Sequence, residues 1–281
     1  MVDGAVQVRS VKVTPHGSVS QDRCVPDEVP VALAYDGSTY AVMMASPSDL
    51  EDFAIGFSLS ERIISTPGEI ESLDVVRHEA GIELRMWLAM GPRRELAERR
   101  RLIAGPTGCG LCGVESLEAA IRACPRVTSE LRLAAKDIST AIASLAPAQA
   151  LNQRTRAVHG AGFWTKGQGL VAVAEDVGRH NALDKLIGRL RRGTGEVGEG
   201  VILLTSRVSV EMVQKAAVAG APVIVAVSAP TSLALKTAEA AGITLIAVAR
   251  ADGFEVFTHP QRVLEADTRR ADLEGPIGNA A

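Results

Sequence analysis

Four short apolar runs alternate with helical segments in the second half of the chain, and this alternation restricts the fold more than any other feature. The apolar runs are Leu170–Ala174, Val201–Leu204, Pro222–Val227 and Ile243–Ala249. The helical segments between them are Asn181–Leu190, Val208–Ala219 and Ser232–Ala240. Strands that alternate with helices are typical of a parallel sheet covered by helices, and continuous apolar strands indicate burial on both faces. We therefore predict an α/β fold whose larger domain has a mostly parallel sheet.

The first half of the chain predicts a smaller α+β region over residues 29–104. Asp36-Gly37 lies between two apolar runs, which is a strong hairpin signal. A helix is expected to begin with a capping box at Ser48–Glu51 and to run to about Ile64. The expected strands are Val29–Tyr35, Thr39–Met44, Leu73–His78 and Gly81–Ala89.

Changes of pattern divide the rest of the chain. Residues 1–28 have little periodicity and Arg93–Arg101 read as a solvated charged segment. A glycine-rich cysteine loop, expected to be mobile, precedes the α/β domain, and the polar end of the chain is expected to fray. These segments are the loop 105–113, the domain 114–266 and the tail 267–281.

Composition excludes several function classes. The formal net charge of -3 gives no basic field for nucleic acid, and 3% aromatic residues give no stacking platform for single strands. Met1–Ser10 predict no secretory signal. Residues 216–235 carry no charge, but Gly220, Pro222 and Pro230 interrupt them, so we expect a helix end, a buried strand and a helix start, and no membrane span.

Cys109 and Cys112 form the sharpest local motif, because both thiols lie among Gly108, Gly110 and Gly113 and a helix is expected just after them. A helix N-terminus favours the reactive thiolate. A structural zinc site would need two more ligands, and a dinucleotide loop would need a preceding strand. Dithiol redox chemistry and sulfur relay through a persulfide both remain open at this point.

Polar residues follow each predicted strand, and in open α/β sheets ligands bind outside the carboxyl ends of the strands. Arg207, with nearby hydroxyls and a helix start, is a candidate anion cradle. Phe254 and Phe257 could offer a ring face to a planar base or could belong to an edge strand. Asp184 and Lys185 are expected to be solvated helix charges. The serines expected to cap helices are Ser209, Ser228 and Ser232.

Seven ordered motifs together resemble the formate dehydrogenase accessory sulfurtransferase family, FdhD. The resemblance covers roughly residues 27–262. The motifs are Asp49–Phe57, Cys109–Gly113, His159–Gly162, Glu175–Ala182, Ser206–Ser209, Ala229–Leu233 and Phe254–Thr258.

The resemblance implies that the larger domain has the cytidine deaminase fold. It also implies that the protein is a sulfurtransferase that acts as a sulfur carrier. A cysteine desulfurase would load sulfur as a persulfide on Cys109, with Cys112 assisting transfer. The acceptor would be the molybdenum bis(guanine dinucleotide) cofactor, which formate dehydrogenase uses. The chain lacks the deaminase zinc signature, because Gly160-Ala161 follow His159, so deamination is not expected.

The resemblance also assigns cofactor contacts to the segment around Phe254, and the strand-end analysis adds Arg207 and His180. The eight expected cofactor-binding residues are Phe254, Glu255, Val256, Phe257, Thr258, His259, Arg207 and His180. We expect a cytoplasmic homodimer with no protein-bound metal and no nucleic-acid or membrane partner. The alternative function is a chaperone that holds and delivers the cofactor without sulfur chemistry.

Overall fold

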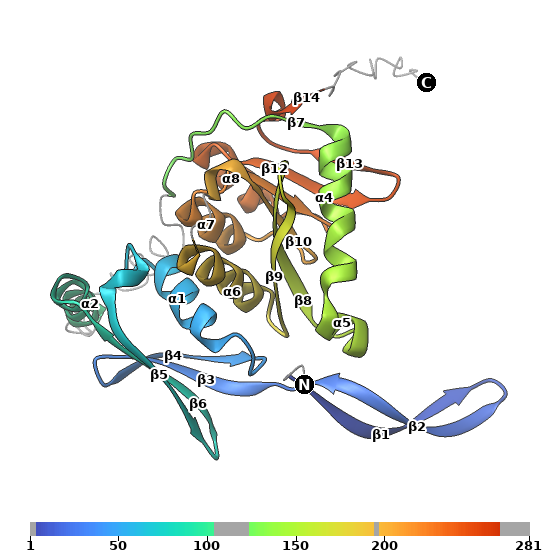
Figure 1. Ribbon diagram of the computed structural model, residues 1–281, viewed down its shortest axis with the longest axis horizontal. Helices are drawn as coiled ribbons and strands as arrows, with labels where there is room; N and C mark the ends of the chain where they lie inside the picture. The colour runs from blue at the N-terminus through green and yellow to red at the C-terminus, as the bar shows by residue number, and fades with distance from the viewer. Residues whose placement is uncertain (1–3, 104–123, 194–196, 265–281) are drawn as a thin grey trace, which may run out of the picture.

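The computed structural model describes residues 4–103, 124–193 and 197–264 (Figure 1). The strands are β1 Ala5–Thr14, β2 Gly17–Pro26, β3 Val29–Tyr35, β4 Ser38–Ala45, β5 Ile70–His78, β6 Gly81–Leu88, β7 Leu133–Ala134, β8 His159–Thr165, β9 Gly169–Asp176, β10 Val201–Leu204, β11 Val223–Ala226, β12 Thr244–Arg250, β13 Gly253–Val256 and β14 Val263–Leu264. The α-helices are α1 Leu50–Ser60, α2 Met90–Ile103, α4 Ala135–Ala148, α5 Ala150–Thr155, α6 Arg179–Arg192, α7 Val210–Ala219 and α8 Ser232–Ala241.

The larger sheet has six strands in the order β13-β12-β11-β10-β8-β9. β10, β11 and β12 are parallel, as the sequence predicts, whereas β8 pairs antiparallel with both of its neighbours. The expectation of a parallel pairing for Leu170–Ala174 is therefore wrong: this run lies in β9, an edge strand paired only with β8. Because two antiparallel steps separate them, β9 still runs in the same direction as β10.

Both faces of this sheet are covered, which explains its uninterrupted apolar strands. Ile202 and Leu204 of β10 pack into the core beneath α6, α7 and α8, while Val201 and Leu203 pack into the core beneath α4. Figure 1 shows α4 on one side of the sheet and α6, α7 and α8 on the opposite side. The α/β class predicted from the alternation is confirmed.

The smaller sheet has the order β4-β3-β6-β5 and packs one face on α1. Its two predicted hairpins are confirmed by the registers of β3 with β4 and β5 with β6. The predicted capping box is wrong: Asp49 is the N-cap in a left-handed conformation, and its side chain makes no cap hydrogen bond. The helix also ends at Ser60, before the expected Ile64.

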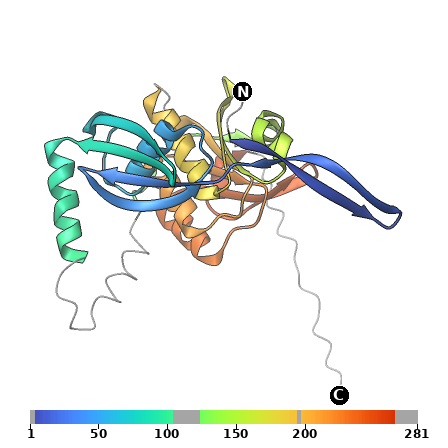
Figure 2. The ribbon, with the colours of Figure 1, turned by 90° about the horizontal axis from the view of Figure 1, so that it is seen from below.

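Residues 5–26, which carry no clear pattern in the sequence, form a long two-stranded hairpin, β1–β2. The alternation is hidden because Val6 and Val8 lie on one face of β1 whereas Val11 and Val13 lie on the other. Figures 1 and 2 show this hairpin projecting from the body, on the side opposite to the smaller sheet.

The uncharged stretch 216–235 holds the end of α7, the buried strand β11 and the start of α8, as predicted. No helix in the described part of the chain is long and apolar enough to span a membrane. Pro147 does not stop α4, which continues to Ala148.

Helices α1 and α6 cross at very short range and so connect the two sheets. The crossing depends on Gly56 in α1 and Gly188 in α6. A methyl group on Gly56 would overlap the carbonyl oxygen of Asp184, and one on Gly188 would overlap that of Asp52. Only hydrogen side chains allow the two backbones to approach this closely.

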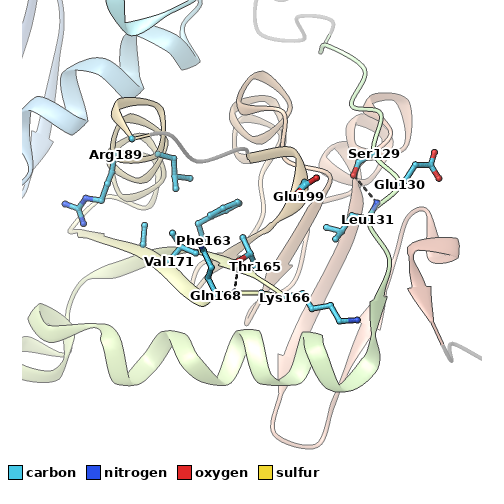
Figure 3. A pocket seen from close by; sticks show the side chains of 14 residues that line it. Ser129, Glu130, Leu131, Phe163, Thr165, Lys166, Gln168, Val171, Arg189 and Glu199 are labelled. Carbon is cyan, nitrogen blue, oxygen red and sulfur yellow. Dashed lines mark hydrogen bonds between the residues drawn. The ribbon is translucent and has the colours of Figure 1, made fainter.

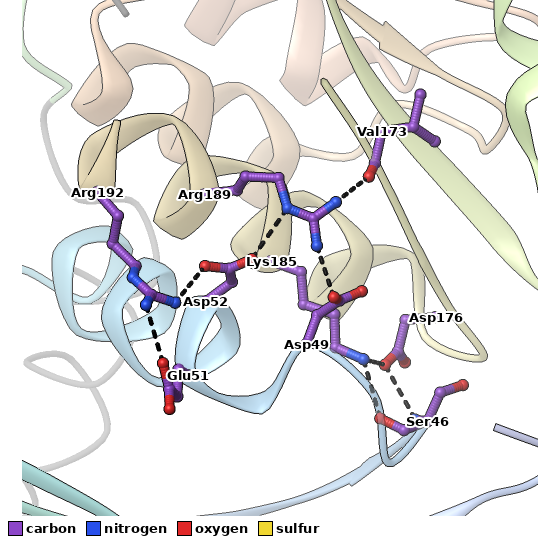
Figure 4. Close-up of polar contacts among 9 residues, drawn as sticks. All are labelled: Ser46, Asp49, Glu51, Asp52, Val173, Asp176, Lys185, Arg189 and Arg192. Carbon is purple, nitrogen blue, oxygen red and sulfur yellow. Dashed lines mark hydrogen bonds and ion pairs between the residues drawn. The ribbon is translucent and has the colours of Figure 1, made fainter. Parts of the chain in front are cut away.

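Ion pairs flank this crossing (Figure 4). The Asp52 carboxylate accepts hydrogen bonds from Arg189 Nε at 3.0 Å and Arg192 Nη1 at 2.9 Å. Arg189 also reaches Asp49 at 2.6 Å, and Arg192 reaches Glu51 at 2.9 Å. Acidic groups of the first turn of α1 thus meet basic groups of the last turn of α6, an arrangement that both helix dipoles favour.

The expectation that Asp184 and Lys185 are solvated is wrong, because both side chains are buried in the same helix. Lys185 Nζ lies 2.7 Å from Asp176 Oδ2, and Lys215 Nζ lies 2.8 Å from Asp184 Oδ1. The two ammonium groups also lie near aromatic rings, Lys185 6.0 Å from that of Phe53 and Lys215 5.7 Å from that of Phe57. A buried charge requires such a partner because desolvation is costly.

We predict that Gly188→Ala destabilises the protein by about 1–3 kcal/mol, because the methyl group forces α1 and α6 apart. Urea unfolding followed by circular dichroism measures this change. Gly91→Ala is the matched control, since Gly91 is also helical but open space surrounds its Cα. Equal unfolding midpoints for the two variants would show that the crossing is not tight.

Candidate functional site

The carboxyl ends of β9, β10, β11 and β12 meet at one edge of the larger sheet, which we call the strand-end edge. Its loops comprise residues 177–178, 205–209 and 227–231. Helices α6, α7 and α8 each begin at this edge, directly after those loops. Their first N–H groups and positive dipole ends therefore favour an anion there.

Backbone hydrogen bonds hold the loops of this edge together. Val208 and Pro230 form an isolated parallel bridge, and Thr231 N–H donates to the carbonyl of Val208 at 3.0 Å. Thr231, not the expected Ser232, caps α8 by accepting a hydrogen bond from the Ala234 N–H at 3.2 Å. Ser209 is the N-cap of α7, but its hydroxyl donates to Glu211 instead of accepting from the helix.

One strained residue lies at this edge. Val248 has φ of 52°, in the left-handed region that β-branched residues rarely adopt. It lies in an irregularity of β12 between Ala247 and Arg250, next to Ser228, whose carbonyl accepts its N–H at 3.4 Å. Such bulges and strained residues occur preferentially beside functional sites.

The motif Glu175–Ala182 divides into structural and edge-facing residues. Glu175 accepts backbone hydrogen bonds from Leu151 and Asn152 at 2.8 Å each and so holds the start of α5. Asp176 is fully buried and accepts from Lys185, from Ser46 N–H at 3.0 Å and from Asn181. Half of this motif therefore fastens the loop after β9 to the segment before α1.

The other half of the motif lies at the strand-end edge. Arg179 Nε and His180 Nε2 are both buried atoms without a hydrogen-bond partner, while Glu211 Oε2 lies 3.6 Å from His180 Nε2. His159, at the start of β8, is brought to the same edge. Burial, together with the nearby guanidinium of Arg179, lowers the pKa of both histidines below 6.5. At neutral pH the positive charge of the edge therefore comes from the arginines.

Arg207 is exposed directly after β10, and the buried Ser206 hydroxyl donates to its carbonyl at 3.0 Å. The structure thus brings the expected residues Arg207 and His180 to one edge. It adds Arg179, His159 and Glu211, which sequence analysis did not select as site residues. His159 could have been found only by recognising β8, because it is the first residue of that strand. The small residues Gly160 and Gly162 hide the alternation of apolar and polar residues that would have indicated a strand.

The expected segment Phe254–His259 does not converge on this edge. It runs along β13 from Gly253, the partner of Arg250, to the opposite edge of the sheet. There the Thr258 hydroxyl donates to Ile243 and accepts from Leu245, and His259 Nε2 lies 3.0 Å from the carbonyl of Glu239. Thr258 therefore holds the segment after β13 to the start of β12 through two buried hydrogen bonds.

Phe254 lies in the edge strand β13, and Phe257 directly follows the last residue of that strand and still donates its N–H to Leu245. Because three positions separate them in this extended segment, the two rings lie on opposite faces. Phe254 and Val256 pack against the core beneath α4, while Glu255 and Phe257 are exposed. The two rings cannot enclose one planar base between them. The assignment of cofactor contacts to Phe254–His259 stays a prediction.

Cys109, Cys112 and the helix expected at 114–121 lie outside the described residues. Of the other cysteines, Cys24 lies in β2, and partial burial raises the pKa of the Cys124 thiol. In the described ranges, no three His, Cys, Asp or Glu side chains are grouped as a metal site requires.

A hollow of about 990 Å³ opens beside the end of β8, away from the strand-end edge (Figure 3). Its charges come from Glu130, Lys166, Arg189 and Glu199. Arg189 is already paired with Asp49 and Asp52, and Lys166 lies 3.6 Å from Asp137. None of the expected site residues lines this hollow, so we place the candidate site at the strand-end edge.

The fold and this edge define an α/β protein whose strand ends favour an anionic ligand and whose sequence adds a vicinal thiol pair. The sequence profile described as the FdhD/NarQ family matches residues 26–264. The chain therefore belongs to the FdhD/NarQ family.

Two relatives are similar over nearly their whole length. The chain is 54% identical over 251 residues to the sulfur carrier protein FdhD of Brucella abortus, covering 89% of this chain and 93% of the relative. It is 52% identical to that of Agrobacterium fabrum, covering 86% and 90%. A crystal structure described as a formate dehydrogenase accessory protein from Desulfotalea psychrophila matches with a TM-score of 0.72 and 28% identity, covering 93% of this chain and 100% of that one.

We predict that His180 titrates below pH 6.5, because burial and Arg179 disfavour its charged form. The unfolded state then binds more protons between the two pKa values, so the free energy of unfolding falls as pH drops through this window. Histidine-selective NMR titration measures the pKa, and His180→Gln should reduce the slope of stability against pH. A His180 resonance that titrates at or above 6.5 contradicts this prediction.

Proposed function

We propose that this protein is a sulfur carrier that holds sulfane sulfur as a persulfide on Cys109. One observation carries the proposal: the Cys109–Cys112 pair occurs in a chain at least 52% identical to two proteins named sulfur carriers. The donor is a cysteine desulfurase, and the reaction takes place in the cytoplasm, where thiols remain reduced.

Loading is a thiol exchange that needs no external oxidant. The Cys109 thiolate attacks the terminal sulfur of the desulfurase persulfide, the S–S bond of that persulfide breaks, and its cysteine leaves as thiolate. Cys109 then carries the additional sulfur. A thiolate is required for this attack, which suits a thiol that precedes a predicted helix start.

Delivery as sulfide requires two electrons, and Cys112 can supply them. Its thiolate attacks the inner sulfur of the Cys109 persulfide, a Cys109–Cys112 disulfide forms, and hydrosulfide leaves. A cellular dithiol then reduces the disulfide. The proposed acceptor is the molybdenum bis(guanine dinucleotide) cofactor, a cargo that formate dehydrogenase, the client, receives.

The strand-end edge suits the phosphates of such a cargo but not its guanine base. Arg179, Arg207 and three helix N-termini suit the pyrophosphate of a guanine dinucleotide. The opposed faces of Phe254 and Phe257 do not suit a base held between two rings. We therefore assign the phosphates, and not the guanine ring, to this edge.

The first test is mass spectrometry of the protein after incubation with a cysteine desulfurase and free cysteine. We expect one added sulfur on the peptide that contains Cys109, absent in Cys109→Ala and retained in Cys112→Ala. Cys24→Ala is the control, because Cys24 lies in β2, outside the motif.

Activation of formate dehydrogenase in cells separates the carrier from the alternative, a cofactor chaperone. A carrier loses activation in Cys109→Ala, whereas a chaperone keeps it. Absence of added sulfur together with intact nucleotide binding would favour the chaperone.

A second prediction concerns the strand-end edge. We predict that Arg207→Ala weakens the binding of guanosine diphosphate about tenfold, because a charge-assisted hydrogen bond to phosphate is lost. Glu211→Gln should strengthen binding about threefold, since a carboxylate beside the anion is removed. Isothermal titration calorimetry measures both, with Arg94→Ala on the exposed side of α2 as control. An unchanged affinity in Arg207→Ala would show that the phosphates do not bind at this edge.

A further inference from the structure

Helix α2, Met90–Ile103, stands at the end of the smaller sheet and covers little of it (Figures 1 and 2). Among residues 90–98, whose side chains the structure describes, Leu96 is the one buried side chain, and it joins the core that α1 shares with the smaller sheet. The other side chains of these turns are exposed or half-buried. The charged segment that the sequence predicts is therefore a helix with an open outer face.

The start of α2 is fixed to the sheet by three hydrogen bonds. The Asp36 carboxylate accepts from the Leu88 N–H at 3.2 Å and from Arg93 Nε at 3.0 Å. Arg93 Nη2 in turn donates to the Leu88 carbonyl at 2.9 Å. A partner that binds here contacts a helix whose first turn is already formed and held, so little conformational entropy is lost on docking.

Two large apolar side chains are exposed beside this helix start, Trp87 at the end of β6 by 46% and Met90 at the start of α2 by 71%. All tryptophan, tyrosine and phenylalanine residues lie in the described ranges, and of these only Trp87 and Phe257 are exposed. Trp87 and Met90 are three positions apart, so their Cα atoms lie within about 10 Å. Arg94, also exposed, is one helical turn beyond Met90 on the same side of α2. Trp, Met and Arg are residue types enriched at protein–protein interfaces, and we call these three residues the α2 surface.

The charge of α2 is opposite to that of the rest of the chain. Its sequence holds five arginines and two glutamates, so its formal charge is +3, and because the whole chain has -3 the remaining residues carry -6. With Arg93 paired to Asp36, a surplus of two positive charges remains on the helix. A basic helix on an acidic protein attracts a partner whose own docking face is acidic. The charged residues are Arg93, Arg94, Glu95, Glu98, Arg99, Arg100 and Arg101.

The position of α2 in the chain indicates which partner this is. Cys109 follows the last residue of α2, Ile103, by six positions, which an extended chain spans in at most about 21 Å. Cys124, the first described residue after the cysteine motif, is fifteen positions from Cys109. Loading requires the donor's persulfide to touch the Cys109 sulfur. Helix α2 is therefore the described element that a donor must approach most closely along the chain.

We propose that the α2 surface docks the protein that donates sulfur, and that this donor presents an acidic rim around an apolar centre. The inference rests on the proposed function, because a persulfide carrier is what needs such a donor. The surface is small, as suits a transient contact, and a carrier must leave its donor before it can deliver. Because α2 adjoins the smaller sheet, a donor docked there leaves the strand-end edge of the larger sheet open to the cargo.

Two donors of different size test the proposal, with the rate of sulfur addition to the Cys109 peptide followed by mass spectrometry. Arg94→Glu should slow loading from a cysteine desulfurase about tenfold at low salt, and high salt should reduce this difference. Loading from glutathione persulfide should not change, because that donor is too small to need a docking surface. Arg132→Glu is the matched control: it makes the same charge change at an exposed position before β7, which lies far from α2 (Figure 1).

The apolar centre is tested by the double variant Trp87→Ser and Met90→Ser. It should raise the desulfurase concentration that gives half-maximal loading about tenfold, with little dependence on salt. Val171→Ser is the control, because Val171 is likewise exposed, on β9. All three side chains are exposed, so the variants should keep the native circular dichroism spectrum.

Fluorine NMR locates the contact, because the chain has two tryptophans and Trp164 is buried. In protein labelled with 5-fluorotryptophan, unlabelled desulfurase should shift or broaden the Trp87 resonance and leave that of Trp164 in place. Trp87→Phe assigns the two resonances.

Equal loading rates from the desulfurase in Arg94→Glu and Arg132→Glu overturn the docking proposal and leave the carrier function standing. An unchanged Trp87 resonance on addition of the desulfurase also overturns it, since the donor then docks elsewhere. So does a Trp87 resonance that moves with the concentration of this chain alone, because a second copy then covers the surface. Absence of loading from either donor contradicts the proposed function itself, and the docking proposal fails with it.

Discussion

The close crossing of α1 and α6 is the contact on which the rest of the structure depends. Gly56 and Gly188 allow the backbones to meet, and Asp52 with Arg189 and Arg192 determines how the two helices are aligned. Helix α1 carries the smaller sheet on its other side, while α6 covers the larger sheet. One helix pair therefore connects two sheets that share no strand.

The same contact positions the strand-end edge. β9 ends at Asp176, whose carboxylate is held by Lys185 of α6 and by the backbone of Ser46 before α1. Arg179 and His180 follow within four residues. The edge-facing groups thus lie in the first turn of α6, between the buried and paired side chains of Asp176 and Asn181, which is how a polar site obtains a rigid support.

Local patterns predicted most of the helices and central strands because each of these elements shows its own period. β10 was predicted with its observed bounds, since its four apolar residues form a short continuous run that is typical of a buried strand. β8 was missed because glycines occupy its positions against α4, where Gly162 packs on Leu145. The β1–β2 hairpin was missed because its valines change faces midway. In both cases the expected alternation of large apolar and polar residues is absent.

Pairing over long distances in the chain could not be predicted. Asp184 and Lys185 look like ordinary helix charges, and only the fold brings Lys215 and Asp176 to them. The strand-end edge was predicted in outline because parallel strands place their ends together whatever their sequence. The path of Phe254–His259 was not, since nothing local indicates that β13 turns back to the opposite edge.

Glu211 is informative about what the edge can do. Its carboxylate accepts the Ser209 hydroxyl at the start of α7 and lies beside His180, which burial keeps neutral. A carboxylate in the first turn stabilises the start of α7, and at an anion site it also repels the ligand. On the proposed function the cargo must also be released, and a carboxylate at the same edge as Arg179 and Arg207 limits how tightly phosphates are held. The edge therefore suits a carrier better than a site that retains its ligand.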